Sequence, residues 1–255
     1  MTQPAVYCAM TVNVVLITGA GQRLGAATAR RLINQGCHVL LHVRSSIAEA
    51  EGLLAQAKAE GAAGSGEVLV ADLTDDNALE RLVTEVANHP LVTDHGLYGV
   101  VHNASFYSPS NFAETSLDAF RQLTRLHMDA PYLLTQGCLQ ALKQRNGSVV
   151  GMVDTSWGRV WDGLAHYTST KAGLRQLMLN LAGELAPEVR VNCVAPGAIM
   201  AADWEAEHFA SVVEKVPLQR SGQASDIAAA IDHLLQHPTI TGHVLHVDGG
   251  WSIVE

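Results

Sequence analysis

The sequence predicts a single α/β domain: a doubly wound parallel sheet of about seven strands with helices on both faces. Short apolar runs rich in β-branched residues alternate with longer segments of helical period along the chain. Such alternation favours parallel strands that are joined by right-handed helical crossovers. The 255 residues, 48% of them hydrophobic, suffice for one large core, and no Pro-, Ser- or Gly-rich linker divides them.

The expected elements follow one another in a regular order. Strands are expected at 12–18, 38–43, 67–71, 97–102, 148–153, 190–194 and 243–247. Helices are expected at 24–35, 47–60, 76–88, 117–144, 165–185 and 224–236. Residues 1–11 are expected to form an N-terminal tail, with Met10 as an alternative natural start, and residues 12–255 to form the domain. In such a sheet, ligands bind at the carboxyl ends of the strands.

Composition argues against several classes of partner. The net charge is −9, and the lysines and arginines form no patch, so neither nucleic acid nor an anionic membrane is an expected partner. No apolar stretch approaches the roughly 20 residues of a membrane span. The four cysteines are widely spaced and form no Cys-x-x-Cys pair, which indicates reduced, mostly buried thiols. We therefore expect a cytoplasmic protein.

The first predicted strand runs into a glycine-rich turn, TGAGQRLG at 18–25, which opens the next helix. Glycines let backbone N–H groups approach a pyrophosphate closely, and the N-terminus of the helix adds a favourable dipole. The position of this turn, directly after the first strand, predicts a nucleotide site of Rossmann type.

The end of the second strand indicates which nicotinamide cofactor binds. An acidic residue there bonds the ribose 2′-hydroxyl of NAD, whereas here the chain continues from His42 to Arg44 and Ser45, with no carboxylate until Glu49. Arg44 can form two hydrogen bonds with a 2′-phosphate, and the Ser45 hydroxyl can donate one to it, which favours NADPH. The alternative is a solvated arginine that opens a surface helix.

The third and fourth strands also end in polar residues. Asp72 can accept a hydrogen bond from an adenine amino group, or it can cap the following helix. The fourth strand ends in a small polar segment, 102–105, that precedes Phe106 and Tyr107. An aromatic ring beside a nicotinamide pocket favours a flat substrate that stacks, although packing in the core explains either ring equally well.

Tyr167 and Lys171 provide a candidate acid-base pair. Four residues apart on the helix predicted at 165–185, they lie about 40° apart around its axis. An ammonium beside a phenol favours the phenolate, so we expect the pKa of Tyr167 to fall below its usual value of about 10. A chance pair on a solvated helix would show the same spacing.

Five motifs in order resemble the short-chain dehydrogenase/reductase superfamily. They are the glycine turn, Asn103-Ala104, Tyr167-x-x-x-Lys171, Pro196-Gly197 and Asp248-Gly249-Gly250. The resemblance runs from about residue 12 to the C-terminus. Asp154 stands where the superfamily usually has serine, and Arg23 stands where it usually has a third glycine. Both departures are similar to the pteridine reductase and dihydromonapterin reductase branch.

The resemblance implies NADPH, a pterin substrate and a cytoplasmic enzyme, commonly a homotetramer built on the helices at 117–144 and 165–185. The cofactor-binding residues it implies are Gly19, Gln22, Arg23, Leu24, His42, Arg44, Ser45, Asp72, Leu73, Asn103, Ala104, Tyr167, Lys171, Pro196, Gly197 and Ile199. The expected substrate-binding residues are Arg23, Ser105, Phe106, Tyr107, Asp154, Trp161, Tyr167 and Trp204. Tyr107 is the expected stacking ring, with Phe106 as the alternative. The segment 198–215 is expected to form a substrate loop.

The expected catalytic residues are Asp154, Tyr167, Lys171 and His127. His127 replaces the asparagine that supports a water-lysine proton relay in the superfamily. A histidine can hold the same water or exchange protons itself, and a purely structural role is the alternative. We expect no catalytic metal. Where two of the twelve histidines stand three or four residues apart in the sequence, no carboxylate residue lies between them.

Asp154 bears on the choice of substrate. A neutral serine suits a developing oxyanion, which an ionised aspartate would repel, so Asp154 favours a ring with N–H donors or a basic nitrogen. The sequence thus predicts NADPH-dependent reduction of a dihydropterin of the dihydromonapterin or dihydrobiopterin type, with at most weak activity on dihydrofolate. The alternatives are a reductase of a small carbonyl compound, in which Asp154 only caps a turn, and a catalytically silent protein that binds NADPH.

Overall fold

The computed structural model describes residues 11–107, 109–158, 160–201 and 206–254. Seven parallel strands form one sheet in the order β3-β2-β1-β4-β5-β6-β7. The strands are β1 (Val14–Thr18), β2 (His38–Val43), β3 (Ser65–Val70), β4 (Gly99–His102), β5 (Ser148–Met152), β6 (Arg190–Pro196) and β7 (Val244–Val247). The predicted fold class is confirmed, and the predicted strand ends differ from these by at most two residues.

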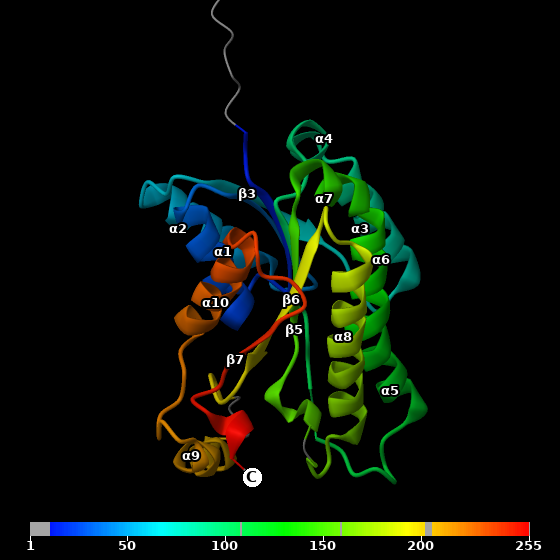
Figure 1. Ribbon diagram of the computed structural model, residues 1–255, viewed down its shortest axis with the longest axis vertical. Helices are drawn as coiled ribbons and strands as arrows, with labels where there is room; N and C mark the ends of the chain where they lie inside the picture. Colours follow the sequence, from blue (N-terminus) through cyan, green and yellow to red (C-terminus); the bar gives the residue numbers. More distant parts are fainter. Residues whose placement is uncertain (1–10, 108, 159, 202–205, 255) are drawn as a thin grey trace, which may run out of the picture.

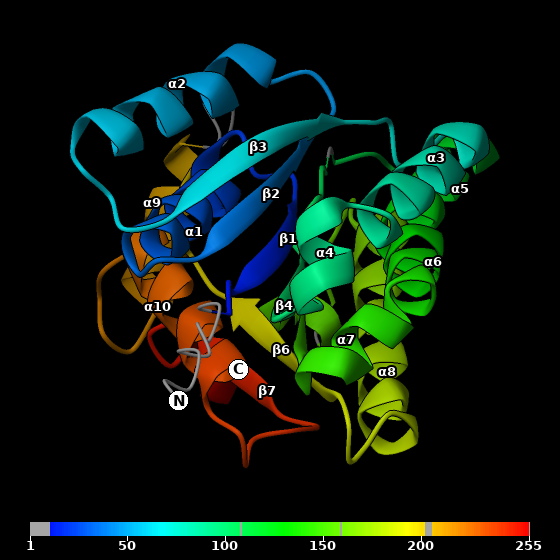
Figure 2. The ribbon, with the colours of Figure 1, turned by 90° about the horizontal axis from the view of Figure 1, so that it is seen from above.

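Helices cover both faces of the sheet (Figures 1 and 2). One layer holds α1 (Arg23–Asn34), α2 (Ile47–Ala59) and α10 (Ala224–Gln236). The other holds α3 (Asp76–Ala87), α4 (Pro90–His95), α5 (Leu117–Thr124), α6 (Ala130–Gly137), α7 (Leu139–Arg145) and α8 (Ala165–Glu184). Seen in Figure 2, the two layers lie on opposite sides of the sheet.

Both faces of the sheet are buried, which explains the continuous apolar runs in the sequence. In β1, Val14 and Leu16 belong to the core beneath the layer of α3 to α8, whereas Val15 and Ile17 belong to the core beneath α1, α2 and α10. All four side chains are fully buried. Because successive side chains of a strand point to opposite faces, each strand contributes to both cores and holds the two layers together.

The helix predicted over 117–144 is wrong as a single element. After α5, the chain forms a π-helical turn, η1 (Arg125–Asp129), before α6, and α7 then follows. The Ala130 N–H bonds to the Arg125 carbonyl, five residues back. Pro131 has no N–H to continue the ordinary pattern, which accounts for a local change of register at this point.

Among the described residues, two α-helices occur where none is predicted. The short helix α4 begins at Pro90, whose fixed φ and missing N–H suit the first position of a helix. Helix α9 (Ala206–Lys215) lies within the segment expected to form a substrate loop. In Figure 1 it lies beside the C-terminal segment, at the carboxyl-end side of the sheet.

The described part of the chain holds no helix that is long and apolar enough to cross a membrane. Cys37, Cys138 and Cys193 are buried thiols outside any disulfide, and burial is the main cause that raises the pKa of each of them above its usual value. This confirms the expected reduced state for these three cysteines. Cys8 lies outside the described residues.

Candidate active site

A cavity of about 960 Å³ opens at the carboxyl ends of the strands. All sixteen residues expected to bind the cofactor line it, as do the expected substrate residues, apart from Trp204. Trp204 lies outside the described residues. His127 does not line this cavity; its ring nitrogens contact Ser105, which does line it, and Thr170, which does not. The sheet therefore brings together residues that stand up to 232 positions apart in the sequence, from Gly19 to Trp251.

The glycine turn is built for close backbone packing. Gly19 has a φ of +67°, and a Cβ atom there would lie 2.9 Å from the Ala104 Cα. A Cβ on Gly25 would lie 2.1 Å from the Gly19 carbonyl oxygen. No acidic side chain stands in the first turn of α1. The N-terminus of α1 is therefore free of a competing carboxylate, and the turn fits a pyrophosphate.

Asn103 and Thr18 hold this turn against β4. The Asn103 side-chain amide donates to the carbonyl oxygens of Thr18, at 2.9 Å, and Gly19, at 3.0 Å. The Thr18 hydroxyl accepts from the backbone N–H groups of Asn103 and Ala104, each at 3.0 Å. Asn103, an expected cofactor contact, thus stabilises the conformation of the glycine turn through its side chain.

His42 joins the glycine turn to the end of β3. Its Nε2 lies 3.1 Å from the Ala71 carbonyl oxygen, which can only accept, so Nε2 carries the proton. Nδ1 then accepts from the Gly19 N–H at 3.3 Å. Burial is the main cause that lowers the pKa of His42 to about 4, so the ring is neutral. Arg44 and Ser45 follow it, exposed on the wall of the cavity.

Asp72 does not cap the helix that follows it. That cap is Asp75, whose side chain accepts from the Ala78 N–H at 2.7 Å. Asp72 instead accepts from both the N–H and the hydroxyl of Thr74, at 2.9 and 2.7 Å. The Thr74 hydroxyl is the largest cause that lowers the pKa of Asp72, and the Arg44 charge adds to it. The carboxylate is thereby held ionised on the cavity wall.

Arg23 reaches across the cavity mouth. Its φ is +50°, in the left-handed region that a glycine usually occupies, where the superfamily commonly has one. The guanidinium donates to the carbonyl oxygens of Met200, at 2.6 Å, and Ala201, at 3.4 Å. Arg23 thus ties the glycine turn to the segment after β6.

The three residues expected at the reacting centre lie together on the floor of the cavity. Asp154 follows β5, and Tyr167 and Lys171 lie in the first turns of α8. The Tyr167 hydroxyl donates to Asp154 Oδ2 at 3.0 Å, and Asp154 Oδ1 accepts from the Ser156 N–H at 2.8 Å. Lys171 Nζ donates to the Met152 carbonyl oxygen at 2.8 Å and lies 5.7 Å from the centre of the Tyr167 ring.

The expected lowering of the Tyr167 pKa is wrong for this arrangement. Burial, followed by the charge of Asp154 and the hydrogen bond to it, raises the pKa of Tyr167 well above 10. Burial also lowers the pKa of Lys171 to about 8, against the opposing charge of Asp154. The ammonium bonds a carbonyl oxygen rather than the phenol, so desolvation and the carboxylate decide the protonation state of the tyrosine. Tyr167 therefore holds its proton at neutral pH.

His127 forms a hydrogen-bonded chain behind Tyr167. Its Nδ1 lies 2.8 Å from the Thr170 hydroxyl, which also donates to the Tyr167 carbonyl at 2.8 Å. Since that hydroxyl has one proton, His127 Nδ1–H must donate to it, and Nε2 accepts from the Ser105 hydroxyl at 2.9 Å. The Ser105 side chain also lies beside the Tyr167 hydroxyl. Burial lowers the pKa of His127 to about 2, so the ring is neutral.

Aromatic side chains surround the floor of the cavity. The Tyr107 ring centre lies 5.3 Å from that of Tyr167, and Phe106 is 40% exposed on the wall. Trp161 packs edge to face against Trp251, with 5.3 Å between the ring centres.

Trp157 does not line the cavity. It stacks on the Arg175 guanidinium instead, at 4.0 Å from the ring centre.

The sequence did not identify several residues that line the cavity. Trp251 follows Asp248-Gly249-Gly250 directly, so the motif itself was a signal that this ring lies near the site. Asp162 also lines the cavity, and no sequence motif marked it, whereas Met200 lies in the segment 198–215 that was expected to form a substrate loop. Their placement depends on how the segments after β5 and β6 fold over the cavity.

Comparisons with known proteins agree with this geometry. Residues 19–252 match the family model described as enoyl-(acyl carrier protein) reductase. Dihydromonapterin reductases are similar over 241 residues, that of Klebsiella pneumoniae at 30% identity and that of Escherichia coli at 29%, each match covering 92% of this chain and 95% of the relative.

Solved structures are similar over almost the whole chain as well. The FolM alternative dihydrofolate reductase 1 of Brucella canis, complexed with NADP, superposes with a TM-score of 0.83 at 27% identity, covering 95% of each chain. A putative NAD(P)-dependent gluconate 5-dehydrogenase of Beutenbergia cavernae, with bound NADP, gives 0.86 at 26% identity, covering 96% of this chain and 98% of the other.

Proposed function

Because the chain belongs to the enoyl-(acyl carrier protein) reductase family, within the short-chain dehydrogenase/reductase superfamily, we propose that its cavity reduces a dihydropterin with NADPH. The chain is an NADP-dependent oxidoreductase. The proposed substrate is of the dihydromonapterin or dihydrobiopterin type, with dihydrofolate as a weaker one. The observation that carries the choice of substrate is the Asp154–Tyr167 contact at 3.0 Å on the cavity floor.

The cavity fits the pyrophosphate and the 2′-phosphate of NADPH. The glycine turn leaves no room for a Cβ atom on Gly25, so backbone N–H groups can approach a pyrophosphate there. Arg44 and Ser45 are exposed on the wall at the end of β2, where a 2′-phosphate would lie. Glu49, the nearest acidic side chain in sequence, is engaged by Gln22 at 2.9 Å.

Asp154 suits a pterin better than a simple ketone. A ketone becomes an oxyanion as it accepts hydride, and a carboxylate on the same floor would repel that charge. The amino and ring N–H groups of a pterin can instead donate to Asp154 Oδ2. Oδ1 is already engaged by the Ser156 N–H, which fixes the orientation of the carboxylate.

Reduction of a dihydropterin C=N bond adds a hydride to carbon and a proton to nitrogen. NADPH, when bound, supplies the hydride. Tyr167 holds a proton on its hydroxyl beside Asp154, in position to donate it to a ring nitrogen. The neutral ring of His127 accepts from the Ser105 hydroxyl and thereby holds Ser105 beside this phenol, which supports a positioning role for His127.

The aromatic walls suit a flat ring. Tyr107 lies close to Tyr167, with 5.3 Å between the ring centres, which supports Tyr107 as the ring that stacks on the substrate. Phe106 also lines the cavity. Trp161, braced by Trp251, lies on the wall as a further candidate for contact with the substrate.

The first experiment is NADPH oxidation by the purified protein with 7,8-dihydromonapterin, 7,8-dihydrobiopterin, 7,8-dihydrofolate and a panel of small ketones. We expect turnover of the first two, slower turnover of dihydrofolate and little of the ketones. Tyr167→Phe is the control and should abolish turnover while NADPH still binds. Activity on ketones alone would overturn the pterin proposal and reduce Asp154 to a turn residue.

The cofactor choice has its own test at Arg44. Arg44→Ala should raise the KM for NADPH by roughly 10- to 100-fold, because a charge-assisted hydrogen bond to phosphate is worth about 1.5–3 kcal/mol. The KM for NADH should change little. Arg30→Ala is the matched control, since Arg30 pairs with Glu60 and does not line the cavity. An equal effect of Arg44→Ala on both cofactors contradicts the 2′-phosphate assignment.

We also infer a cytoplasmic homotetramer. The support is a set of exposed apolar side chains on α5 and α6, the helices within the segment expected to form the interface. They are Leu117, Phe120, Tyr132 and Leu133, at 60%, 38%, 47% and 37% exposure. Light scattering of the purified protein measures the mass directly, and a monomer of 27.2 kDa is the contrary result.

A further inference from the structure

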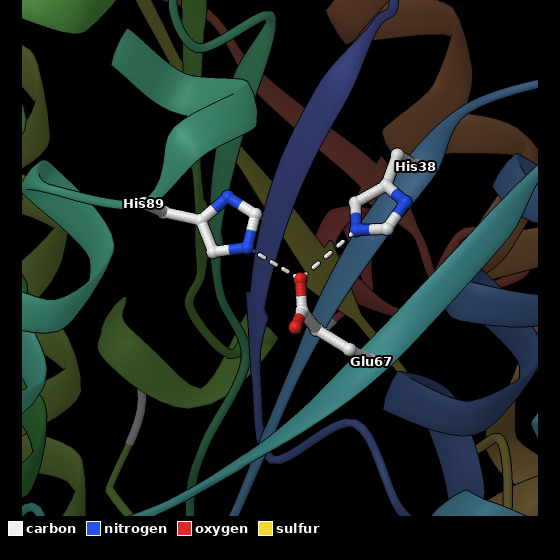
Figure 3. A group of neighbouring side chains, drawn as sticks. All are labelled: His38, Glu67 and His89. Atoms are coloured by element: carbon white, nitrogen blue, oxygen red, sulfur yellow. Dashed lines mark hydrogen bonds and ion pairs between the residues drawn. The ribbon is translucent and has the colours of Figure 1, made fainter.

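A second group of chemically active side chains, drawn in Figure 3, lies toward the amino ends of the strands and away from the cavity. His38 is the first residue of β2, Glu67 lies in β3, and His89 is the residue that caps the N-terminus of α4. Both imidazoles point at the Glu67 carboxylate, which lies between them. The distance to Glu67 Oε1 is 3.1 Å from His38 Nε2 and 2.5 Å from His89 Nε2.

The backbone and a neighbouring hydroxyl hold these side chains in place. His38 pairs with Ser65 in the β2–β3 ladder, and its Nδ1 lies 2.8 Å from the Ser65 hydroxyl, which directs Nε2 toward Glu67. The His89 carbonyl accepts from the N–H groups of Val92 and Thr93, each at 2.9 Å, which anchors the start of α4. The ligand atoms therefore converge from three separate segments of the chain before anything binds.

Hydrogen bonding leaves one buried nitrogen of this group, His89 Nδ1, without a partner among the described residues. Both imidazoles direct Nε2 at the same oxygen, Oε1. One nitrogen from each histidine and one carboxylate oxygen lie within 4.8 Å of one another. In a tetrahedral zinc site with bonds of about 2.0–2.1 Å, ligand atoms lie roughly 3.3 Å apart, so closure needs side-chain movements of only about 1 Å.

We propose that His38, Glu67 and His89 bind one divalent transition-metal ion of the Zn²⁺ type. Two imidazoles and one carboxylate are a ligand set that Zn²⁺ favours, with water in the fourth position. The histidine side chains are 13% exposed and Glu67 is 44% exposed, so the site is enclosed on the protein side and open to solvent at the carboxylate. The Ser65 hydroxyl can accept from His38 Nδ1, the kind of outer contact that orients metal-binding histidines.

The proposed site is separate from the reductase cavity. None of its three residues lines the cavity, and Val43, which does, lies five residue steps along β2 from His38, about 16 Å at roughly 3.3 Å per residue. A metal ion here would join β2, the edge strand β3 and the start of α4. We therefore expect it to stabilise the fold and to leave reductase turnover unchanged.

The test uses the full-length protein without a histidine tag, stripped with EDTA and dialysed. Titration with ZnCl₂ should show one tight site per chain by calorimetry, and Co²⁺ should give the visible absorption of a tetrahedral complex. Zn²⁺ at one hundred times its Kd should raise the Tm by about 5 °C or more, because it binds only the folded chain.

Three variants locate the site. His89→Ala and Glu67→Gln should each lower Zn²⁺ affinity at least tenfold and remove most of the Tm increase. Glu67→Gln keeps the size of the side chain and one acceptor oxygen for the two histidines, so it is the deciding variant if His89→Ala folds poorly. His237→Ala is the matched control, because the exposed rings of His233 and His237, 4.0 Å apart, are another place where Zn²⁺ can bind.

Two results would overturn the proposal. One is that the wild-type protein has no tight Zn²⁺ site, or that Glu67→Gln binds Zn²⁺ as tightly as the wild type. Either outcome would leave the group as a hydrogen-bonded contact only. The other is loss of the tight site in His237→Ala with retention in Glu67→Gln, which would move the site to the end of α10.

Discussion

Asp154 uses its two carboxylate oxygens for different purposes. Oδ1 accepts from the Ser156 N–H and closes a turn, while Oδ2 accepts from the Tyr167 hydroxyl. The sequence left a turn residue and a functional carboxylate as alternatives, and the geometry makes them compatible. Closing the turn fixes the direction in which the second oxygen faces the phenol. The electrostatic consequence is that Tyr167 keeps its proton, since the carboxylate disfavours a neighbouring phenolate.

This contact gives a prediction about the tyrosine itself. Asp154→Asn removes the charge but keeps the size of the side chain, so the pKa of Tyr167 should fall. An ultraviolet difference titration of tyrosinate measures this change, with Tyr167→Phe identifying the signal that belongs to this residue. In the same variant, kcat/KM for the dihydropterin should fall by about 10²–10³, as when one polar group of a reacting centre is removed.

Asp162→Asn is the control, because Asp162 also lines the cavity but is not among the groups that shift the pKa of Tyr167. It should leave the titration of Tyr167 unchanged. If Tyr167 titrates alike in Asp154→Asn and in the wild-type protein, the carboxylate does not govern its protonation.

The position of the tyrosine-lysine pair could be predicted from the sequence, but its electrostatics could not. Helical spacing correctly placed Tyr167 and Lys171 on one face of α8. It gave no account of burial, which raises the pKa of one group and lowers that of the other, or of the Met152 carbonyl that Lys171 contacts. Those effects depend on atoms from β5 that lie close only in the folded chain.

At the scale of elements, the turn between β1 and α1 shows how tightly the cofactor end of the cavity is packed. A Cβ atom on Gly25 would lie 2.1 Å from the Gly19 carbonyl oxygen and 2.7 Å from Asn103 Nδ2. Both partners are fixed, because Asn103 is hydrogen-bonded to the turn. Neither can give way to a methyl group without opening the turn.

Gly25→Ala should therefore destabilise the protein by about 1–3 kcal/mol, the usual cost of overpacking, and weaken NADPH binding severely. Gly52→Ala is a matched control within α2, where no atom lies within 4 Å of the added Cβ. It should stabilise the protein by about 0.5–1 kcal/mol, since alanine favours a helix interior. Denaturant titrations of both variants measure the two effects. Normal stability and NADPH affinity in Gly25→Ala would disprove the packing argument.

The elements that the sequence-based prediction missed, or merged into one helix, lack a clear apolar period of their own. Helix α4 is a six-residue helix, too short to show a clear apolar period. The π-helical turn η1 interrupts a pattern that otherwise reads as one helix from 117 to 144, and only Pro131 signals the break. Long elements that pack one face on the sheet, such as α1 and α8, have enough turns for their period to be read from the sequence.

At the scale of the whole molecule, three histidines are buried in the neutral form. His42, His102 and His127 have pKa values lowered to about 4, 3 and 2, in each case mainly by burial. In the unfolded chain, each would titrate near 6.5. Below pH 6.5 the unfolded chain therefore binds protons that the folded chain does not, and stability falls as the pH falls. Asp72 and Asp248, whose pKa values are lowered, lose their contribution only below about pH 4.

We expect the free energy of unfolding to fall by about 4 kcal/mol between pH 7.5 and 5.5, since each neutral histidine loses about 1.4 kcal/mol per pH unit below 6.5. Denaturant titrations across this range measure the slope. In His102→Gln, whose amide can keep the contact that His102 Nε2 makes with Thr135 at 2.9 Å, the loss should be smaller by about 1 kcal/mol. His237→Ala, at an exposed position, should keep the wild-type slope. A wild-type stability that stays constant from pH 7.5 to 5.5 would mean that the buried histidines take up protons in the folded state, contrary to the burial that holds them neutral.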